Sequence, residues 1–520
     1  MKVDDKLVKH IAQLGNIDLS EAEIELYGKQ IQGILQYIET LNQVETKNVK
    51  PTYQTLDNMT NVWREDKLQP ERGLTQKQAL SQAKKTYQGY FVADHVFSAK
   101  SKSAAVQLVK RPQLDKYNAV LTEVNPKGNL GVKDLFCTKD VETTAGSAVL
   151  SGYKPQYSAS LINKLEQAGY KIKNKLNQDA WGHGSSGENS DFGPTKNPWD
   201  LTRVAGGSSS GSAVSVAIGD VEIATGTDTC GSIRMPANFT NICGLKPSYG
   251  ALSRYGVIAF ASSLDCPGLF ARTVAKLKVV FDRVAGFDPQ DPTSQSPARN
   301  KPAVKKIKTI GLPKEFFAAG LNPEIKKLIH AAADKLKQQG YLIKTVSLPH
   351  SVYGIAAYYL IAPTETCSNL GRYDGVRYGQ DRSYFGPEAK RRIMLGSFAS
   401  SAGYSAQYYA KAAKIRTLIV QDFAQVFNQV EAIMAPVAPM PPFKIGEKSA
   451  NPLEMYLADI YAAPASLAGL PSLAIPCGFT RDKLPVGMQL IGPRWSEQPL
   501  FELGELYQRI TDWHLEKPKL

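Results

Sequence analysis

From about residue 116 onwards, the chain alternates short β-branched runs with stretches of helical spacing, and this alternation restricts the fold more than any other feature. Residues 118–123 predict a strand and residues 158–168 predict a helix. Such alternation favours an α/β or mixed-sheet domain over residues 116–520. A chain of 520 residues with 43% hydrophobic and 21% charged residues also excludes disordered, collagen-like and coiled-coil proteins.

The first 45 residues predict two helices. Leu7, Ile11 and Leu14 have helical spacing, and Gly15 can end that helix. A second helix of about 20 residues begins after a capping box of Ser20 and Glu23. Its narrow apolar stripe needs a covering surface, which is either the body of this chain or a separate subunit. The stripe consists of Ile24, Tyr27, Ile31, Ile34, Ile38 and Leu41.

Residues 46–115 lack clear periodicity and contain several prolines among many polar residues. A stretch of this length without strong elements is long for a compact domain, so we expect an extended strap. The expected organisation is therefore a helical segment over 1–45, a strap over 46–115 and an α/β domain over 116–520.

Charge and cysteine content limit the class of protein. The six cysteines form no CxxC pair, so we expect neither a zinc site nor a disulfide framework. No apolar run reaches the length of a membrane span and the first residues are polar, which predicts a cytoplasmic protein. The net charge is +14, with four lysines against eight acidic residues in 1–45. The first 45 residues are therefore acidic, and the basic excess lies in the rest of the chain, where it is explained equally well by RNA binding and by solvated surface lysines.

A Gly/Ser-rich loop over residues 203–211 precedes a run of small residues. Backbone N–H groups at such a loop and helix start suit anions and oxyanions. Three interpretations are open: a flexible loop, a phosphate loop, or the GxSxG elbow of a hydrolase with Ser209 as nucleophile. The phosphate loop is disfavoured because no Gly-Lys-Ser/Thr follows.

A second glycine-flanked serine, Ser232, lies in TGTDTCGSIRMP, 24 residues after Ser208. Lys133 in GVKDLFCT lies 75 residues before Ser208. A serine hydroxyl is a weak nucleophile that needs a base, and a lysine serves as that base only when burial makes it neutral. The three residues are the parts of a Ser–Ser–Lys relay.

Long motifs now make the chain recognisable. GVKD, GSSGENSDFGPTKNPWD, AGGSSSGSA, GTDTCGSIRMPA and LPVGMQLIG resemble the amidase signature family. SNLGRYDGVRYG, KRRIMLGSFASSAGYSAQYY and PLEMYLADI are most similar to the A subunits of aspartyl/glutamyl-tRNA amidotransferases within it. Residues from about 10 to 97 resemble the C subunit of the same enzymes. The chain therefore resembles a C-subunit/A-subunit fusion.

The resemblance implies a mixed sheet covered by helices and a catalytic triad of Lys133, Ser208 and Ser232. It assigns Ser208 as the relay after a cis Gly207–Ser208 peptide and Ser232 as the nucleophile, which displaces the Ser209 interpretation. Backbone N–H groups of the turn from Thr229 to Ser232 would form the oxyanion hole. The oxyanion residues expected on this basis are Thr229, Cys230 and Gly231.

Glutamine recognition in the A subunits carries over to Tyr358, Arg392 and Asp459. An arginine fork suits the α-carboxylate and an aspartate suits the α-ammonium of a free amino acid. Without the resemblance, an internal salt bridge would be the usual interpretation of both charged residues. Tyr359 is an alternative to Tyr358 at a shift of one position.

Four features depart from the family pattern. Cys230 replaces a glycine of the oxyanion turn, and a positive φ there would penalise its Cβ and impair the turn, a defect that Cys230→Gly would relieve. Ser210 replaces another glycine, His183 stands where an apolar residue is usual, and the segment 379–386 is short. We expect the short segment to alter access to the site or docking of a partner.

The expected function is the ammonia-generating glutaminase component of a tRNA-dependent amidotransferase. The implied partner is a B subunit that binds tRNA and uses ATP and Mg²⁺, so we expect no metal or cofactor in this chain. Two other functions remain open. They are a stand-alone amidase for another small amide, which has no need of a C-like segment, and a non-catalytic assembly subunit, which has no need of an intact triad.

Overall fold

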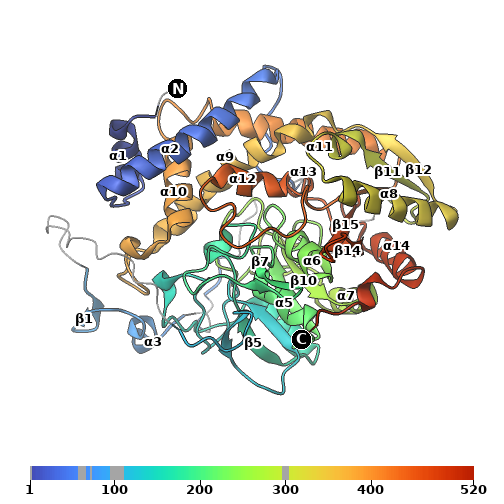
Figure 1. The fold of residues 1–520 in the computed structure, drawn as a ribbon. Helices are drawn as coiled ribbons and strands as arrows, with labels where there is room; N and C mark the ends of the chain where they lie inside the picture. Colours follow the sequence, from blue (N-terminus) through green and yellow to red (C-terminus); the bar gives the residue numbers. More distant parts are fainter. Residues whose placement is uncertain are drawn as a thin grey trace.

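The structure is a computed structural model that describes residues 3–56, 66–68, 70, 73–93, 111–295 and 304–519. Every residue that we predict for the site lies in these ranges. The strap predicted over 46–115 lies partly outside the described residues. Figure 1 shows the arrangement of the elements along the chain.

One mixed sheet forms the centre of the molecule. Within the described ranges it has eleven strands in the order β12-β11-β13-β15-β14-β9-β10-β8-β4-β5-β3. Four neighbouring pairs, β11/β12, β11/β13, β4/β5 and β4/β8, are parallel, whereas the other pairs are antiparallel. The strands are β3 (Val120–Glu123), β4 (Leu130–Lys133), β5 (Ile172–Leu176), β8 (Ile223–Thr227), β9 (Cys243–Lys246), β10 (Pro267–Ala271), β11 (Thr309–Pro313), β12 (Leu342–Val346), β13 (Ala432–Pro436), β14 (Ser472–Phe479) and β15 (Pro485–Ile491). The predicted α/β class with a mixed sheet is confirmed.

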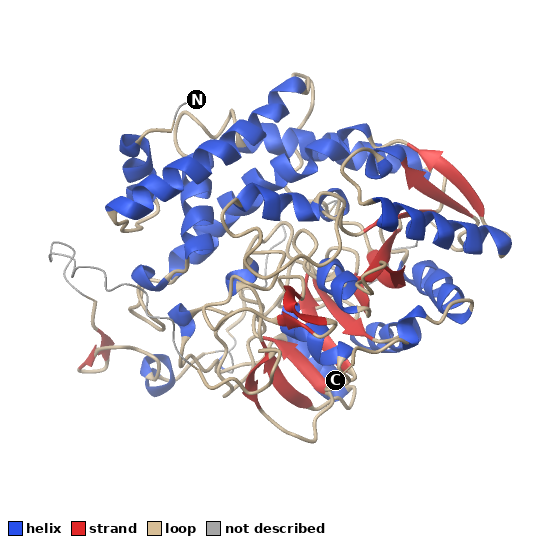
Figure 2. Cartoon of the chain, in the orientation of Figure 1, coloured by secondary structure: helices blue, strands red, loops and turns tan. Residues whose placement is uncertain are grey.

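Helices cover the sheet, and most of the long ones gather in one layer at the top of Figure 2. The helices of the main domain are α4 (Ser160–Gln167), α5 (Ser210–Ala217), α6 (Arg234–Thr240), α7 (Val274–Val284), α8 (Pro323–Gln338), α9 (Gly354–Asn369), α10 (Pro387–Ser400), α11 (Tyr409–Phe427), α12 (Pro452–Tyr456), α13 (Ala463–Leu467) and α14 (Glu497–Arg509). Short 3₁₀ helices are η3 (Ala148–Leu150), η4 (Ala180–Gly182), η5 (Lys314–Phe317), η6 (Pro349–Tyr353), η7 (Leu370–Arg372), η8 (Arg382–Tyr384), η9 (Leu457–Asp459) and η10 (Trp513–Leu515). The described part of the chain contains no helix with the length and apolar character of a membrane span.

The two predicted N-terminal helices are present as α1 (Asp5–Leu14) and α2 (Glu21–Ile38), followed by η1 (Glu39–Gln43). Ser20 and Glu23 form the predicted capping box, which fixes where α2 begins. The apolar stripe of α2 is buried. It is covered by the body of this chain, because α2 packs along α9, α10 and α12 (Figure 1).

The described start of the strap is fixed to α11 and to the loop before α14. Thr52 N–H donates to the Ala413 carbonyl at 3.0 Å, and Arg416 donates to the Tyr53 carbonyl at 3.1 Å. Arg494 also donates to the Thr55 carbonyl. Further along, α3 (Gln76–Leu80) precedes a small hairpin of β1 (Thr86–Tyr87) and β2 (Tyr90–Phe91) with exposed aromatic side chains.

Within the main domain, a second small sheet joins β6 (Lys196–Asn197) to β7 (Asp200–Val204).

Candidate active site

Lys133 is the last residue of β4, the third strand from one edge of the large sheet, and is fully buried. Its Nζ lies 2.8 Å from Ser208 Oγ, 2.9 Å from Ser209 Oγ and 2.7 Å from Thr227 Oγ1. Thr227 ends the neighbouring strand β8, and the two serines lie at the start of α5. The parallel pair β4/β8 therefore brings the lysine next to the Gly/Ser loop.

Burial determines the protonation of this lysine. It lowers the pKa of Lys133 to about 7, against the opposing effect of the Asp179, Asp228 and Asp265 carboxylates. A lysine with this pKa is neutral in a large fraction of molecules near neutral pH. It can therefore accept a proton, which an exposed lysine does not do.

The hydroxyls around Nζ have different hydrogen-bonding roles. A neutral amine has two N–H donors and one lone pair, whereas three hydroxyls surround it. Ser209 Oγ donates to the Thr227 carbonyl at 3.3 Å, so Ser209 accepts an N–H from Lys133. The lone pair is left for Ser208 or Thr227. Ser208 is thus able to pass a proton to the lysine, while Ser209 holds the lysine in place.

The peptide between Gly207 and Ser208 is cis, as the resemblance implies. Gly207 N–H donates to the Ser185 carbonyl at 2.8 Å. A Cβ at Gly207 would overlap a carboxylate oxygen of Asp179, so a side chain cannot fit there. Asp179 in turn accepts N–H groups of Gly187 and Asn189. These contacts hold the loop that presents Ser208 to the lysine.

Ser232 lies in the turn between β8 and α6, with 5% of its surface exposed. Ser209 N–H donates to the Ser232 carbonyl at 3.3 Å, which joins the two serine turns. Among the described residues, this backbone hydrogen bond links Ser232 to Ser209, whereas the side-chain hydrogen bonds of Lys133 go to Ser208 and Ser209 and not to the Ser232 hydroxyl. The structure therefore brings Lys133 and Ser208 into direct contact and places Ser232 beside them.

A buried ion pair supports the turn that carries Ser232. Arg234 pairs with Asp228 at 3.0 Å and also donates to the Cys230 carbonyl at 2.5 Å. Although burial alone would raise it, the Arg234 guanidinium holds the pKa of Asp228 below its usual value. Ser466 Oγ donates to the same Cys230 carbonyl at 2.9 Å. Arg234 and Ser466 thus hold the Cys230 carbonyl on one face of the turn, which leaves the backbone N–H groups of the turn to point toward the opposite face.

The expectation that Cys230 strains the oxyanion turn is wrong. Cys230 is not among the described residues with positive φ, so its Cβ carries no conformational penalty. The next residue, Gly231, is the one that excludes a side chain, since a Cβ there would lie 2.6 Å from Asp459 Oδ1 and 2.9 Å from Ala462 Cβ. Burial raises the pKa of the Cys230 thiol well above its usual value, so the thiol stays protonated. The assignment of Thr229, Cys230 and Gly231 to the oxyanion hole stays a prediction, and the Thr229 hydroxyl donates to Asp265 at 2.9 Å.

Arg392 on α10 lies in an aromatic and charged environment. Its Nε donates to Glu388 at 2.7 Å and its Nη2 donates to Tyr359 Oη at 3.2 Å. Its guanidinium lies 5.3 Å from the centre of the Phe260 ring and 5.0 Å from that of Tyr359. Tyr359 stacks on Tyr456 with ring centres 3.7 Å apart. Tyr359 thus belongs to the wall that supports Arg392.

Asp459, in η9, lies next to the oxyanion turn and is buried. One carboxylate oxygen accepts from Ser185 Oγ. Burial raises the pKa of Asp459 to about 7. Tyr358 is buried on α9 with its ring centre 5.1 Å from that of Tyr359, and burial raises its pKa well above the usual range.

Among the buried polar side-chain atoms without a hydrogen-bond partner in the described part of the chain, two belong to the charged residues predicted to bind substrate. They are Nη1 of Arg392 and Oδ1 of Asp459. A buried polar atom without a partner is costly and therefore needs an explanation, and a bound ligand would supply the missing partner here. The pair matches the α-carboxylate and α-ammonium groups of an amino acid.

The remaining departures from the family pattern have local explanations. His183 is buried against Phe260 with ring centres 4.6 Å apart, and burial with the nearby charge of Arg392 lowers its pKa well below the usual value. Ser210 Oγ donates to Thr195 Oγ1 at 2.9 Å. In the short segment 379–386, Arg382 donates to the Gly15 carbonyl. The short segment therefore packs against the end of α1.

Several contacts of the site were not predicted from the sequence. Thr227 and Ser209 bind the lysine, Ser185 binds Asp459, and Glu388 binds Arg392. Thr227 and Ser185 lie inside motifs that the resemblance used, so their position in TGTDT and GSSGENSD was a signal. Glu388 lies one helical turn before Arg392, which also could have indicated an ion pair.

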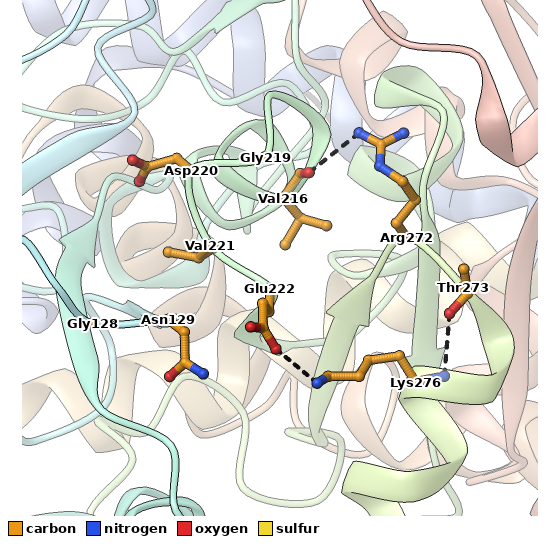
Figure 3. Close-up of a pocket in the computed structure, with 10 residues that line it drawn as sticks. All are labelled: Gly128, Asn129, Val216, Gly219, Asp220, Val221, Glu222, Arg272, Thr273 and Lys276. Atoms are coloured by element: carbon orange, nitrogen blue, oxygen red, sulfur yellow. Dashed lines mark hydrogen bonds and ion pairs between the residues drawn. The ribbon is translucent and has the colours of Figure 1, made fainter.

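A separate cavity of about 520 Å³ lies away from these residues, around the loop before β8 and the start of α7 (Figure 3). Its polar side chains bind one another or the backbone, as the Lys276–Glu222 ion pair at 2.7 Å shows. Arg272 donates to the Val216 carbonyl at its edge. None of the predicted site residues lines it.

Models of known protein families match two parts of this chain. The amidase family model matches residues 129–501, which is more than half of the chain. The model of the Glu-tRNAGln amidotransferase C subunit matches residues 19–92. The second match crosses residue 45, and the division of the chain at residues 45 and 115 stays a prediction.

Individual relatives are A subunits of the same kind of enzyme. The A subunit of glutamyl-tRNA(Gln) amidotransferase from Chloroflexus aggregans is 48% identical over 75% of this chain and 84% of that protein. The corresponding A subunit from Myxococcus xanthus is 48% identical over 74% of this chain and 83% of that protein. The crystal structure of the Thermotoga maritima A subunit has a TM-score of 0.65 and 37% identity, and covers 74% of this chain and 86% of that one. The predicted amidase signature fold and hydrolase class are confirmed.

The pKa of Lys133 predicts how the reactivity of Ser232 depends on pH. Because only the neutral lysine accepts a proton, labelling of Ser232 by a serine-directed fluorophosphonate should slow about tenfold per pH unit below about pH 7. Labelling rates between about pH 5.5 and 8.5 can be followed by mass spectrometry. Lys133→Arg, which stays charged, should label slowly at every pH. A rate independent of pH would contradict the assignment of Lys133 as the base.

Proposed function

Because this chain belongs to the amidase family, we propose that it is the glutamine-hydrolysing component of a tRNA-dependent amidotransferase. The observation that carries this proposal is the contact of the buried Lys133 with Ser208 beside Ser232, next to the unpartnered atoms of Arg392 and Asp459. The first group supplies an amide-cleaving site. The second supplies recognition of a free amino acid.

The proposed reaction begins with glutamine held by its α-carboxylate at Arg392 and its α-ammonium at Asp459. Tyr358 borders the same space. Ser232 Oγ attacks the side-chain amide carbon, and its proton passes through Ser208 to neutral Lys133. Backbone N–H groups of residues 229–231 stabilise the oxyanion, and we assign Thr229, Cys230 and Gly231 to this role.

The tetrahedral intermediate then collapses with cleavage of the C–N bond. Lys133 returns the proton through Ser208 to the leaving nitrogen, so ammonia departs and an ester to Ser232 remains. Water attacks this ester and gives a proton to the relay, after which the bond between the acyl carbon and Ser232 Oγ breaks, the relay returns the proton to Ser232 Oγ, and glutamate is released. The charge of Arg392 on the carboxylate and of Asp459 on the ammonium confines the site to amides of amino acids with both groups free.

The ammonia requires an acceptor, and this chain is proposed to work with a B subunit that binds tRNA and uses ATP and Mg²⁺. The relatives are named as components of a glutamyl-tRNA(Gln) amidotransferase, and the C-subunit match supports a complex of several different chains. Exposed Tyr87 and Tyr90 on the β1–β2 hairpin offer apolar surface for such a partner. Charged tRNA is used in the cytoplasm, which is where we place the enzyme.

The two serines near Lys133 give the sharpest test of the mechanism. Ser232→Ala removes the nucleophile and should lower kcat for glutamine by about 10³-fold or more. Ser209→Ala removes one hydrogen bond to the lysine and should cost less than about tenfold. Ammonia release, measured with a coupled assay, gives both values. The opposite ranking would restore Ser209 as the nucleophile.

Cys230→Gly tests the geometry of the oxyanion turn. Since φ at this position is not positive, the substitution relieves no strain, and kcat for glutamine should stay within about twofold. Gly231→Ala is the matched change and should lower kcat strongly, because the added Cβ meets Asp459 and Ala462. A several-fold rise in kcat for Cys230→Gly would mean that the thiol crowds the turn.

A further inference from the structure

Three consecutive basic residues at the start of α10 contact different partners. Arg392 faces the site, while Lys390 and Arg391 contact α2 of the N-terminal segment. Lys390 Nζ lies 2.7 Å from Glu23, and Arg391 Nε donates to Gln30 Oε1 at 2.9 Å. Helix α10 lies next to α2 (Figure 1) and is therefore held between α2 on one side and the site on the other.

Glu388 connects the two arginines. One of its carboxylate oxygens accepts from Arg392 Nε at 2.7 Å and the other pairs with Arg391 Nη1. Tyr456 Oη donates to the first oxygen at 3.1 Å. Glu388 and Arg391 are at most 9% exposed, so little solvent competes for these bonds. The direction of the Arg392 guanidinium thus depends on a carboxylate that Arg391 also holds.

The N-terminal segment covers the outer side of this group. The Arg391 guanidinium lies 5.9 Å from the centre of the Tyr27 ring, and Tyr27 Oη donates to the Pro387 carbonyl at 3.3 Å. Ile17 packs in one apolar cluster with Ala389 and Ile393. Helix α2 therefore fixes Arg391 by a hydrogen bond, an aromatic face and a backbone contact at the first residue of α10.

A cavity beside Arg391 offers its side chain an alternative position if the contacts with α2 are lost. A cavity of about 340 Å³ borders Glu388, Arg391 and Tyr456 on the surface, and Glu188 and Asp191 also line it. A guanidinium that lost its contacts with α2 would gain solvent and acidic neighbours there. Glu388 would then lose one of its two arginines, and the geometry at Arg392 would loosen.

We propose that Gln30, Tyr27 and Arg391 are positioning residues of the substrate site, which fix Glu388 so that Arg392 is held in the orientation that binds the α-carboxylate of glutamine. This inference depends on the proposed function, because it concerns the affinity of that same site. It gives the N-terminal segment a role in substrate affinity, in addition to covering apolar surface. The catalytic residues themselves are not affected.

The test uses the full chain and measures glutamine hydrolysis for matched variants. Gln30→Ala should raise KM about threefold and Arg391→Ala about tenfold, with kcat nearly unchanged, since positioning of the carboxylate affects binding more than the triad. Gln30→Glu keeps an acceptor for Arg391, so its KM should equal that of the unmodified chain. Lys29→Ala is the matched control, because Lys29 pairs with Glu25 on an exposed part of the same helix. Fluorophosphonate labelling of Ser232 reports the triad independently of Arg392.

The outcomes separate this inference from the proposed function. A raised KM in Gln30→Ala and Arg391→Ala, with labelling as in the Lys29→Ala control, supports the inference. If the unmodified chain hydrolyses glutamine and Arg392→Lys raises KM, but Gln30→Ala and Arg391→Ala behave like Lys29→Ala, only the inference fails. If kcat and the rate of Ser232 labelling both fall in Gln30→Ala and Arg391→Ala while KM is unchanged, α2 has a general structural role and the inference is overturned. If the unmodified chain neither binds nor hydrolyses glutamine, both fail.

Discussion

The burial of Lys133 at the end of β4 is the constraint on which the rest of the site depends. A lysine in this position loses its hydration, and only three hydroxyls replace the water. Removing the ammonium from water favours the neutral amine, so the same burial that costs stability supplies a base. The Gly/Ser loop brings the hydroxyls of Ser208 and Ser209 close to the amine, and its path beside Asp179 leaves no room for a side chain at Gly207.

The site combines two halves from different parts of the chain. The strands β4 and β8 with the two serine turns carry the bond-breaking groups, while α9, α10 and η9 carry Tyr358, Arg392 and Asp459. The halves meet at Gly231, where a Cβ would collide with Asp459. The N-terminal segment lies outside the second half and holds α10 through Arg391. Substrate binding and the attached segment are therefore mechanically linked, whereas the lysine and serines depend on the sheet.

Much of the fold and several site residues could be predicted from the sequence, whereas contacts between distant segments could not. The capping box at Ser20 and the strand at 118–123 were readable because local chemistry determines them. The resemblance placed Lys133, Ser208 and Arg392, yet it could not show that Thr227 and Ser209 share the lysine, since those contacts require the strand pairing. The strain expected at Cys230 was wrong because a residue type does not reveal φ. The role of Glu388 needed the position of α2.

Direct titration of Lys133 tests the central claim most simply. The chain labelled with ¹³Cε-lysine, compared with Lys133→Met to identify the signal, gives the pKa of this amine by NMR without any substrate. The account predicts a midpoint near pH 7, because burial among hydroxyls disfavours the ammonium. A midpoint near the usual lysine value of about 10.4 would contradict it, since the lysine would then be charged at neutral pH and unable to accept the proton of Ser208.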